Sequence, residues 1–225
     1  MTVSPALLDA TRMLQMEPRG PRWRSITYCV VDAVWSIGIN YDRHVVPAVR
    51  RVASNAGDSD PLVLPGVAAP DPFPLDAFLA AYPTTDALVS QTTRHRTSSR
   101  GGILKADAAL RFAGVLVDSG ITTLKDTVPA LDDPERVDAI SARLRAIPGD
   151  GVRTGYFWMT AGDDQTVKPD RMILSFLSRY GGPDDVAGAR VALAELATAL
   201  STPEHPVTPW MVDHAIWNAE RRRRR

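Results

Sequence analysis

The sequence predicts an all-α fold, and three kinds of observation lead to that prediction. Apolar residues recur at helical spacing along most of the chain. Residues that favour helix starts stand before these stretches, and glycines stand after several of them. Valine-rich pieces such as Val45-Val46 are too short and too regularly helical in phase to indicate strands.

The expected helices follow one another along the whole chain. They are Ala6–Met16, Ile26–Ile37, His44–Ala53, a short helix at Leu75–Ala81, Ile103–Val117, Val137–Ala146, Met172–Tyr180, Val186–Leu200 and Met211–Ala219. Start signals stand at Ser4-Pro5, Asp133-Pro134, Pro169-Asp170, Pro183-Asp184 and Thr208-Pro209. Each combines a capping side chain with a proline, which suits a first helical turn. Stop signals stand at Gly57, Gly120, Gly162 and Gly181.

Two irregular segments interrupt this pattern. Asn55–Pro74 is rich in proline and aspartate, which predicts a long surface connection. Gln91–Gly102 is basic, contains glycine and opens a helix, so we predict phosphate contacts from Arg94, Arg96 and Arg100. A solvated polar loop without such contacts fits the same residues.

Charge and cysteine content restrict the class of protein. The chain has 26 basic and 26 acidic residues, and its last five residues, Arg221–Arg225, are all basic. The remainder has 21 basic against 26 acidic residues, so any nucleic-acid surface must be local. We expect the arginines to form a mobile tail that either attracts polyanions or has no role. Cys29 is the only cysteine, which excludes an internal disulfide.

No apolar run is long enough to cross a bilayer, and the first residues lack the features of a signal peptide. We therefore expect a cytoplasmic protein that does not engage a membrane. The histidines and the cysteine form no ligand spacing for a metal. P-loop, dinucleotide and nucleophile-elbow motifs are also missing from the sequence.

The most informative segment joins two expected helices through Pro148-Gly149-Asp150-Gly151. Two glycines one residue apart permit positive φ and leave no Cβ in the way of a ligand. The helix that follows presents unpaired N–H groups and the positive end of its dipole. Such a turn can hold a phosphate through its backbone. Asp170 follows at the next helix start.

Ile147–Thr154 resembles the helix-hairpin-helix of the DNA glycosylase superfamily related to endonuclease III. Val167–Asp170 is similar to the segment that carries the catalytic aspartate of that family, and Ala33–Asp42 resembles a helix-ending turn of the same family. The resemblance implies a two-lobed helical bundle with a helix-hairpin-helix motif. Residues 22–180 would form the central lobe, and residues 1–21 with 181–225 would complete the second lobe.

The resemblance also implies partners and ligands. DNA would be the partner, and we expect the protein to act as a monomer. The DNA contacts of the hairpin would come from Gly149, Gly151, Val152, Arg153 and Thr154. The backbone carbonyls of Ile147, Gly149 and Val152 would bind a monovalent cation. No other cofactor is expected, because a single cysteine cannot hold the four-cysteine iron–sulfur cluster of many relatives.

Hydrolysis of an N-glycosidic bond builds positive charge on the sugar, which a nearby carboxylate stabilises. Asp170 is the candidate carboxylate, although an aspartate after a proline is also an ordinary helix cap. Relatives that also cut the strand have a lysine at the position of Arg153, and arginine cannot form their Schiff base. We predict a monofunctional glycosylase. The alternatives are a non-catalytic DNA-binding protein of the same fold and a protein–protein adaptor.

A glycosylase also needs a pocket that stacks and reads the extruded base. Tyr28 and Trp35 are seven residues apart and share one helix face, and Asn40, Tyr41 and Asp42 follow at the end of that helix. We predict that these five residues line the base pocket. The aromatic residues could equally belong to the core, and Asp42 could cap the next helix.

Overall fold

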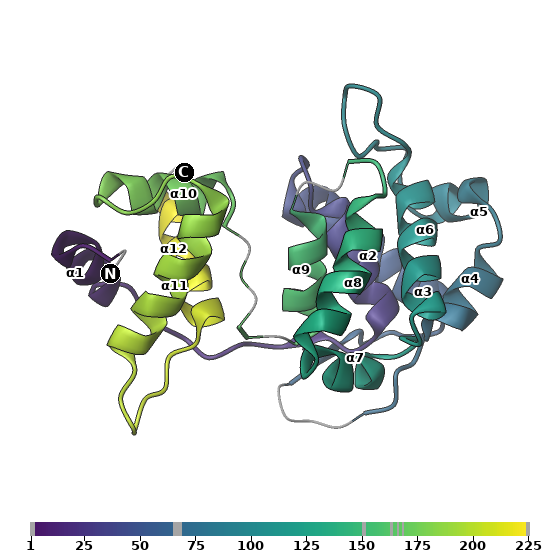
Figure 1. Cartoon of the computed structure of the whole chain (residues 1–225). Helices are drawn as coiled ribbons and strands as arrows, with labels where there is room; N and C mark the ends of the chain where they lie inside the picture. Colours follow the sequence, from purple (N-terminus) through teal and green to yellow (C-terminus); the bar gives the residue numbers. More distant parts are fainter. Residues whose placement is uncertain are drawn as a thin grey trace. The chain divides into compact units, whose positions relative to one another are not determined.

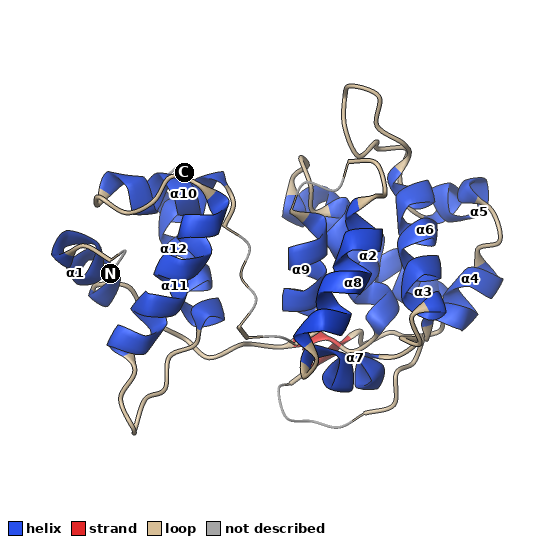
Figure 2. Cartoon of the chain, viewed as in Figure 1, coloured by secondary structure: helices blue, strands red, loops and turns tan. Residues whose placement is uncertain are grey.

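The computed structural model describes residues 3–64, 69–149, 152–162, 164–165, 167 and 169–223. Twelve α-helices lie in this described part, and helix accounts for 60% of the structure (Figure 2). The all-α prediction is therefore confirmed. The chain divides into two compact units (Figure 1). Gly20–Ala161 is the central unit, and Met1–Arg19 with Gly162–Arg225 is the terminal unit.

The central unit contains most of the elements. They are β1 (Arg22–Trp23), α2 (Ile26–Trp35), the π-helix η1 (Tyr41–Val45), α3 (Val46–Asn55), β2 (Leu62–Val63), α4 (Leu75–Ala81), α5 (Thr85–Gln91), α6 (Lys105–Asp118), α7 (Leu124–Leu131), α8 (Pro134–Arg145) and α9 (Arg153–Thr160). β1 and β2 pair antiparallel as a short two-stranded sheet. The terminal unit contains α1 (Pro5–Arg12), α10 (Arg171–Arg179), α11 (Val186–Leu200) and α12 (Pro209–Arg223).

The central unit is built around α2. All ten residues of this helix are buried, and it packs against α3, α6 and α9. Because it is covered on every side, its sequence is apolar all round instead of amphipathic. Asp32 is the one charged residue within it.

One carboxylate caps two helices of the central unit. Asp71 Oδ2 accepts hydrogen bonds from the backbone N–H of Ile26, which begins α2, at 2.9 Å and of Leu124, which begins α7, at 3.0 Å. The positive ends of both helix dipoles favour this negative charge. Asp71 lies in the segment expected to be a plain surface connection, so that segment has a structural role.

The other end of α2 is capped by a buried lysine. The ammonium group of Lys105, whose side chain has no exposed surface, donates to the carbonyls of Val34, Trp35 and Ile37 at 3.0, 3.0 and 2.6 Å. A helix end leaves such carbonyls without intrahelical partners. Three acceptors match the three N–H donors of the ammonium group. The negative charge at the start of α2 and the positive charge at its end both agree with the helix dipole.

In the terminal unit, α10 and α11 pack against α12, and α1 packs against α11. The core of this unit includes Leu7, Ile173, Leu193 and Ile216. Ser4 caps α1, and its hydroxyl donates to the carbonyl of Tyr180, just after α10, at 2.7 Å. Helix α1 is thereby tied to the helices of the C-terminal part.

The structure departs from the sequence predictions in three places. The units divide after Ala161 rather than at residue 180, so α10 belongs to the terminal unit. Helices α5 and α7 were not expected. Helix α12 continues to Arg223, so the first three terminal arginines are helical instead of part of a mobile tail. Across the described residues, no helix combines the length and the apolar character that crossing a membrane requires.

Replacing Lys105 by methionine should destabilise the protein by about 3 kcal/mol, because buried carbonyls at the end of α2 lose their donor. Equilibrium unfolding in urea measures this change. Lys125→Met is the matched control, since Lys125 is exposed on α7, and it should stay within about 0.5 kcal/mol of wild type. Equal stabilities of the two variants would show that the ammonium cap is dispensable.

Candidate functional site

The predicted hairpin begins where α8 ends. Ala146 is the C-cap of α8, and the backbone N–H of Ile147 donates to the carbonyl of Leu144 at 3.2 Å. Gly149 has a φ of +77°, the left-handed conformation that glycine adopts without strain. Helix α9 then begins at Arg153. The predicted contact residue Gly151, together with Asp150, lies outside the described residues.

Gly149 lies directly against Thr97 of the basic segment. A Cβ on Gly149 would stand 2.4 Å from both Cβ and Oγ1 of Thr97, closer than any real Cβ contact. Packing against a neighbouring loop therefore explains why glycine is needed at this position. The sequence alone had instead suggested close approach by a phosphate as the reason for this glycine. The hydroxyl of Thr97 is buried and makes no hydrogen bond to a described residue. The contact brings the hairpin and the basic segment side by side.

The basic segment is a well-defined loop. The backbone N–H of Thr97 donates to the carbonyl of Ile103 at 2.9 Å, and Arg96 Nη1 donates to the carbonyl of Gly102 at 2.7 Å. Gly102 has no room for a Cβ, which would meet Ser98 N at 2.3 Å. The loop thus folds on itself and joins directly to α6.

The three arginines predicted to contact phosphate, Arg94, Arg96 and Arg100, are all exposed. They stand beside the hairpin because Thr97, within the same loop, touches Gly149. The loop therefore carries three exposed positive charges, in a chain whose formal net charge is zero. We call these three arginines and the adjoining Gly149 the basic loop–hairpin surface.

Two histidines adjoin this surface. The rings of His44 and His95 lie 5.0 Å apart between centroids, and His95 Nδ1 lies 2.8 Å from Thr93 Oγ1. Burial lowers the pKa of His95, and the nearby His44 and Lys105 lower it further. His95 is therefore neutral near pH 7 and adds positive charge only under more acidic conditions.

Two of the predicted hairpin contacts are buried. The side chain of Arg153 has no exposed surface, and Thr154 is 1% exposed. Arg153 Nη2 donates to the carbonyl of Ile147 at 3.0 Å, and its guanidinium lies 5.7 Å from the centroid of the Phe112 ring. Arg153 is thus directed into the protein, against the expectation that it contacts DNA. Val152 is half-buried at the start of α9.

The five predicted base-pocket residues separate into two groups. Tyr28 and Trp35 are fully buried in the core, where Tyr28 donates to Asp58 Oδ2 at 3.0 Å and Trp35 Nε1 donates to Thr93 Oγ1 at 2.9 Å. Neither aromatic ring offers a face to a ligand in this structure, which corrects the sequence assignment. The core alternative holds for both.

The turn after α2 is more accessible. Asn40 and Asp42 are exposed, and Tyr41 is half-buried. Asn40 Oδ1 accepts from the backbone N–H of Arg43 at 2.9 Å, so this side chain caps the π-helix. π-Helical turns often occur at functional sites. Of the five predicted pocket residues, these three are the ones with side chains at least partly exposed.

A buried carboxylate supports Tyr41. Asp32, which is 1% exposed, accepts from Tyr41 Oη at 2.8 Å and from Trp23 Nε1 at 2.6 Å. Burial raises the pKa of Tyr41, and Asp32 raises it further. The pKa of Tyr156 is raised by burial and by the same carboxylate. Asp32 is a charged residue inside an otherwise apolar helix, and this feature of the sequence could have predicted the cluster.

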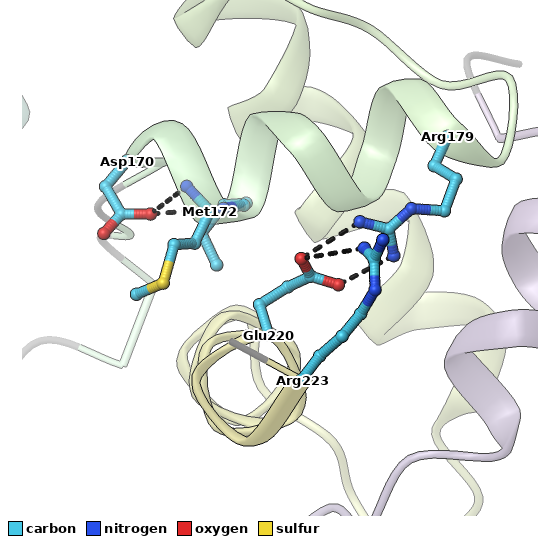
Figure 3. A network of polar contacts seen from close by, with 6 residues as sticks. Asp170, Met172, Arg179, Glu220 and Arg223 are labelled. Carbon is cyan, nitrogen blue, oxygen red and sulfur yellow. Dashed lines mark hydrogen bonds and ion pairs between the residues drawn. The ribbon is translucent and has the colours of Figure 1, made fainter. Parts of the chain in front are cut away.

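Asp170 caps α10 with one oxygen only. Its Oδ1 accepts from the backbone N–H groups of Met172 at 2.7 Å and Ile173 at 3.1 Å (Figure 3). Its Oδ2 makes no hydrogen bond or ion pair with a described residue, and Figure 3 shows this oxygen directed away from the helix. The cap fixes the orientation of the carboxylate, and one oxygen stays available for a ligand.

The far end of α10 is held by a buried ion pair. Arg179 donates through Nη1 and Nη2 to Glu220 of α12, at 2.7 and 3.0 Å (Figure 3). The Glu220 side chain is only 3% exposed, and Arg223 Nη1 lies 3.5 Å from it. Such a pair is costly to break from one side. Sequence reasoning missed it because its two partners are 41 residues apart.

Asp164, which precedes Asp170 in the chain, contacts the start of α12. Arg19 Nη2 pairs with Asp164 Oδ1 at 2.6 Å and stacks over the Trp210 ring at 4.6 Å. The backbone N–H of Trp210 donates to the carbonyl of Asp164 at 3.1 Å. His214 also stacks on Trp210, with 4.7 Å between the ring centroids. Asp164 and Asp170 are thus each held by contacts within the terminal unit.

Among the described residues, no three side chains of histidine, cysteine, aspartate or glutamate lie close enough together to hold a metal ion. Cys29 is buried, and burial raises the pKa of its thiol. It therefore stays protonated and is a poor ligand.

A family model described as "Domain of unknown function (DUF8548)" matches residues 5–221. No curated protein and no solved structure matches the chain. The match spans both units, so a single family model covers the two.

Gly149→Ala should destabilise the protein by about 1–3 kcal/mol, because the added methyl group overlaps Thr97. Gly57→Ala is the control, since Gly57 has a similar φ of +78° but open space around it. Thr97→Gly should relieve the overlap, so the double variant should show a coupling energy above about 0.5 kcal/mol in urea unfolding. Simple additivity of the two changes would contradict the contact between hairpin and loop.

Proposed function

Because the chain belongs to the DUF8548 family, whose description names no reaction, we propose a function from the site: monofunctional DNA base excision. The protein would hydrolyse the N-glycosidic bond of a damaged or modified base and leave an abasic site. The observation that carries this proposal is the carboxylate of Asp170, which is oriented by a helix cap through Oδ1 and retains Oδ2 for a ligand.

The chemistry needs a fixed anion near the anomeric carbon. As the base departs, the sugar gains positive charge, and a carboxylate that is already oriented stabilises it without reorganisation. The same oxygen can orient or deprotonate the attacking water. Asp170 Oδ2 has both roles in our proposal. The capping bonds to Met172 and Ile173 keep the carboxylate in place throughout.

Binding of DNA would use the basic loop–hairpin surface. Arg94 and Arg100 are exposed, and Arg96 is anchored through its bond to the carbonyl of Gly102. Arginine suits phosphate because its planar fork can donate two parallel bonds. A local surface of this kind supports DNA binding by a chain without net positive charge.

The lysines that the structure describes do not suit a Schiff-base mechanism, which favours hydrolysis by water. The sequence has three lysines, Lys105, Lys125 and Lys168. The ammonium group of Lys105 is buried and bonded to three carbonyls, and Lys125 is exposed on α7 of the central unit. Arg153 cannot form an imine, because it stays protonated at any working pH. Lys168 lies outside the described residues.

A DNA-binding protein without catalysis is the second candidate. It is favoured by one observation, that capping of α10 alone accounts for an aspartate at residue 170. The two candidates make the same prediction for binding and opposite predictions for release of a base.

Asp170→Asn should slow base release at least about 100-fold in single-turnover assays on lesion-containing duplexes. Asparagine keeps the helix cap, so stability and DNA affinity should stay near wild type. Asp185→Asn is the matched control, because Asp185 caps α11 with the same geometry. It should retain full activity.

The product assay identifies the subclass. The abasic strand should remain intact until hot alkali cleaves it, and borohydride should trap no protein–DNA adduct. Trapping by wild type that is lost in Lys168→Gln would show a lysine mechanism. Activity of Asp170→Asn within about threefold of wild type would remove this carboxylate from the chemistry.

Neutralising Arg94 and Arg100 together, each to glutamine, should weaken binding to duplexes of any sequence. The slope of log affinity against log salt should fall by about 2, because two phosphate contacts are lost. Arg12→Gln with Arg190→Gln removes the same charge from exposed sites of the terminal unit and serves as the control. An unchanged slope in the loop variant would place the DNA elsewhere.

A further inference from the structure

A buried guanidinium stands at the point where α8 ends. Arg153 begins α9, yet its side chain turns back and donates from Nη2 to the carbonyl of Ile147 at 3.0 Å. The side chain has no exposed surface and lies over the Phe112 ring. The positive charge beside the Ile147 carbonyl thus belongs to a side chain of the protein.

The position suits a positive charge for a physical reason. The last carbonyls of α8 lack intrahelical partners and form the negative end of the helix dipole. An arginine guanidinium stays charged even when it is buried. It therefore supplies at this point the positive charge that a bound cation would otherwise supply, and it adds an N–H donor to the Ile147 carbonyl.

The resemblance to helix-hairpin-helix proteins implies a monovalent cation on the carbonyls of Ile147, Gly149 and Val152, and the residues present do not fit it. The Ile147 carbonyl accepts from Arg153, and the Val152 carbonyl accepts the helical bond from the Tyr156 N–H at 3.0 Å. A metal ion on the Ile147 oxygen would share that oxygen with a guanidinium. Two positive charges so close together in a buried place repel each other strongly.

We propose that Arg153 replaces the alkali cation of the hairpin, so that the stability of this part of the chain does not depend on potassium or sodium. This inference concerns the hairpin fold and stands apart from the proposed glycosylase reaction, because thermal unfolding tests it without DNA.

The inference predicts a gain of cation dependence when the guanidinium is removed. In Arg153→Met the Ile147 carbonyl loses its donor, and the volume of the side chain is largely kept. A small monovalent ion can then approach the carbonyl, whereas tetramethylammonium is too large to be held by it. Arg153→Lys keeps a positive charge at the same place and should behave as wild type does.

Thermal unfolding of the full chain is measured in potassium, sodium and tetramethylammonium chloride at one ionic strength. Wild type and Arg153→Lys should unfold at the same temperature in all three salts. Arg153→Met should unfold at a lower temperature than wild type in tetramethylammonium and recover by about 2–4 °C in potassium or sodium. Arg145→Met is the matched control, because it removes an exposed arginine from the last turn of α8, and it should show no preference among the salts.

Two results would overturn the inference. The first is a wild-type protein whose unfolding temperature differs between potassium and tetramethylammonium. The second is an Arg153→Met variant that is destabilised equally in all three salts, because the guanidinium would then act through packing alone. If Arg153→Met does not fold, the salt series on wild type and Arg153→Lys still decides the first point.

Discussion

The structure of the central unit depends on a buried ammonium group at the end of α2. Lys105 bonds to three carbonyls there, and its backbone N–H donates to the carbonyl of His95 in the basic loop at 2.8 Å. One residue thereby joins the central helix, the turn that carries Tyr41 and the loop that carries the exposed arginines. Asp71 supplies the opposite charge at the start of α2. The basic loop–hairpin surface is presented by this framework, and its geometry follows from that of α2.

The sequence predicted elements with long, regular patterns and missed short ones. Val186–Leu200 was expected with the bounds that α11 has, because apolar spacing and the preceding aspartate agree. Helix α7 was missed, although Thr123 and Asp126 form a capping box, since Pro129 within it weakens the helical pattern. The apolar periodicity of one segment cannot predict contacts between that segment and a distant part of the chain.

The same limit applies to the candidate site. The positive φ of Gly149, the arginine loop and the capping aspartate were predicted from local residue types, because glycine, arginine and aspartate each have a definite conformational or chemical preference. The burial of Tyr28, Trp35 and Arg153 depends on helices far away in the sequence, so it could not be read from their own segments. The support of Tyr41 by Asp32 was hidden for the same reason.

The proposed catalytic function depends on the carboxylate of Asp170, which a helix cap orients through Oδ1. A crystal structure of the protein with a duplex that contains an abasic-site analogue tests this role most directly. We predict that the sugar of the analogue is turned out of the helix with its anomeric carbon facing Asp170 Oδ2. A duplex bound with the sugar still stacked, and with Asp170 facing only protein or solvent, would contradict the proposed catalytic function.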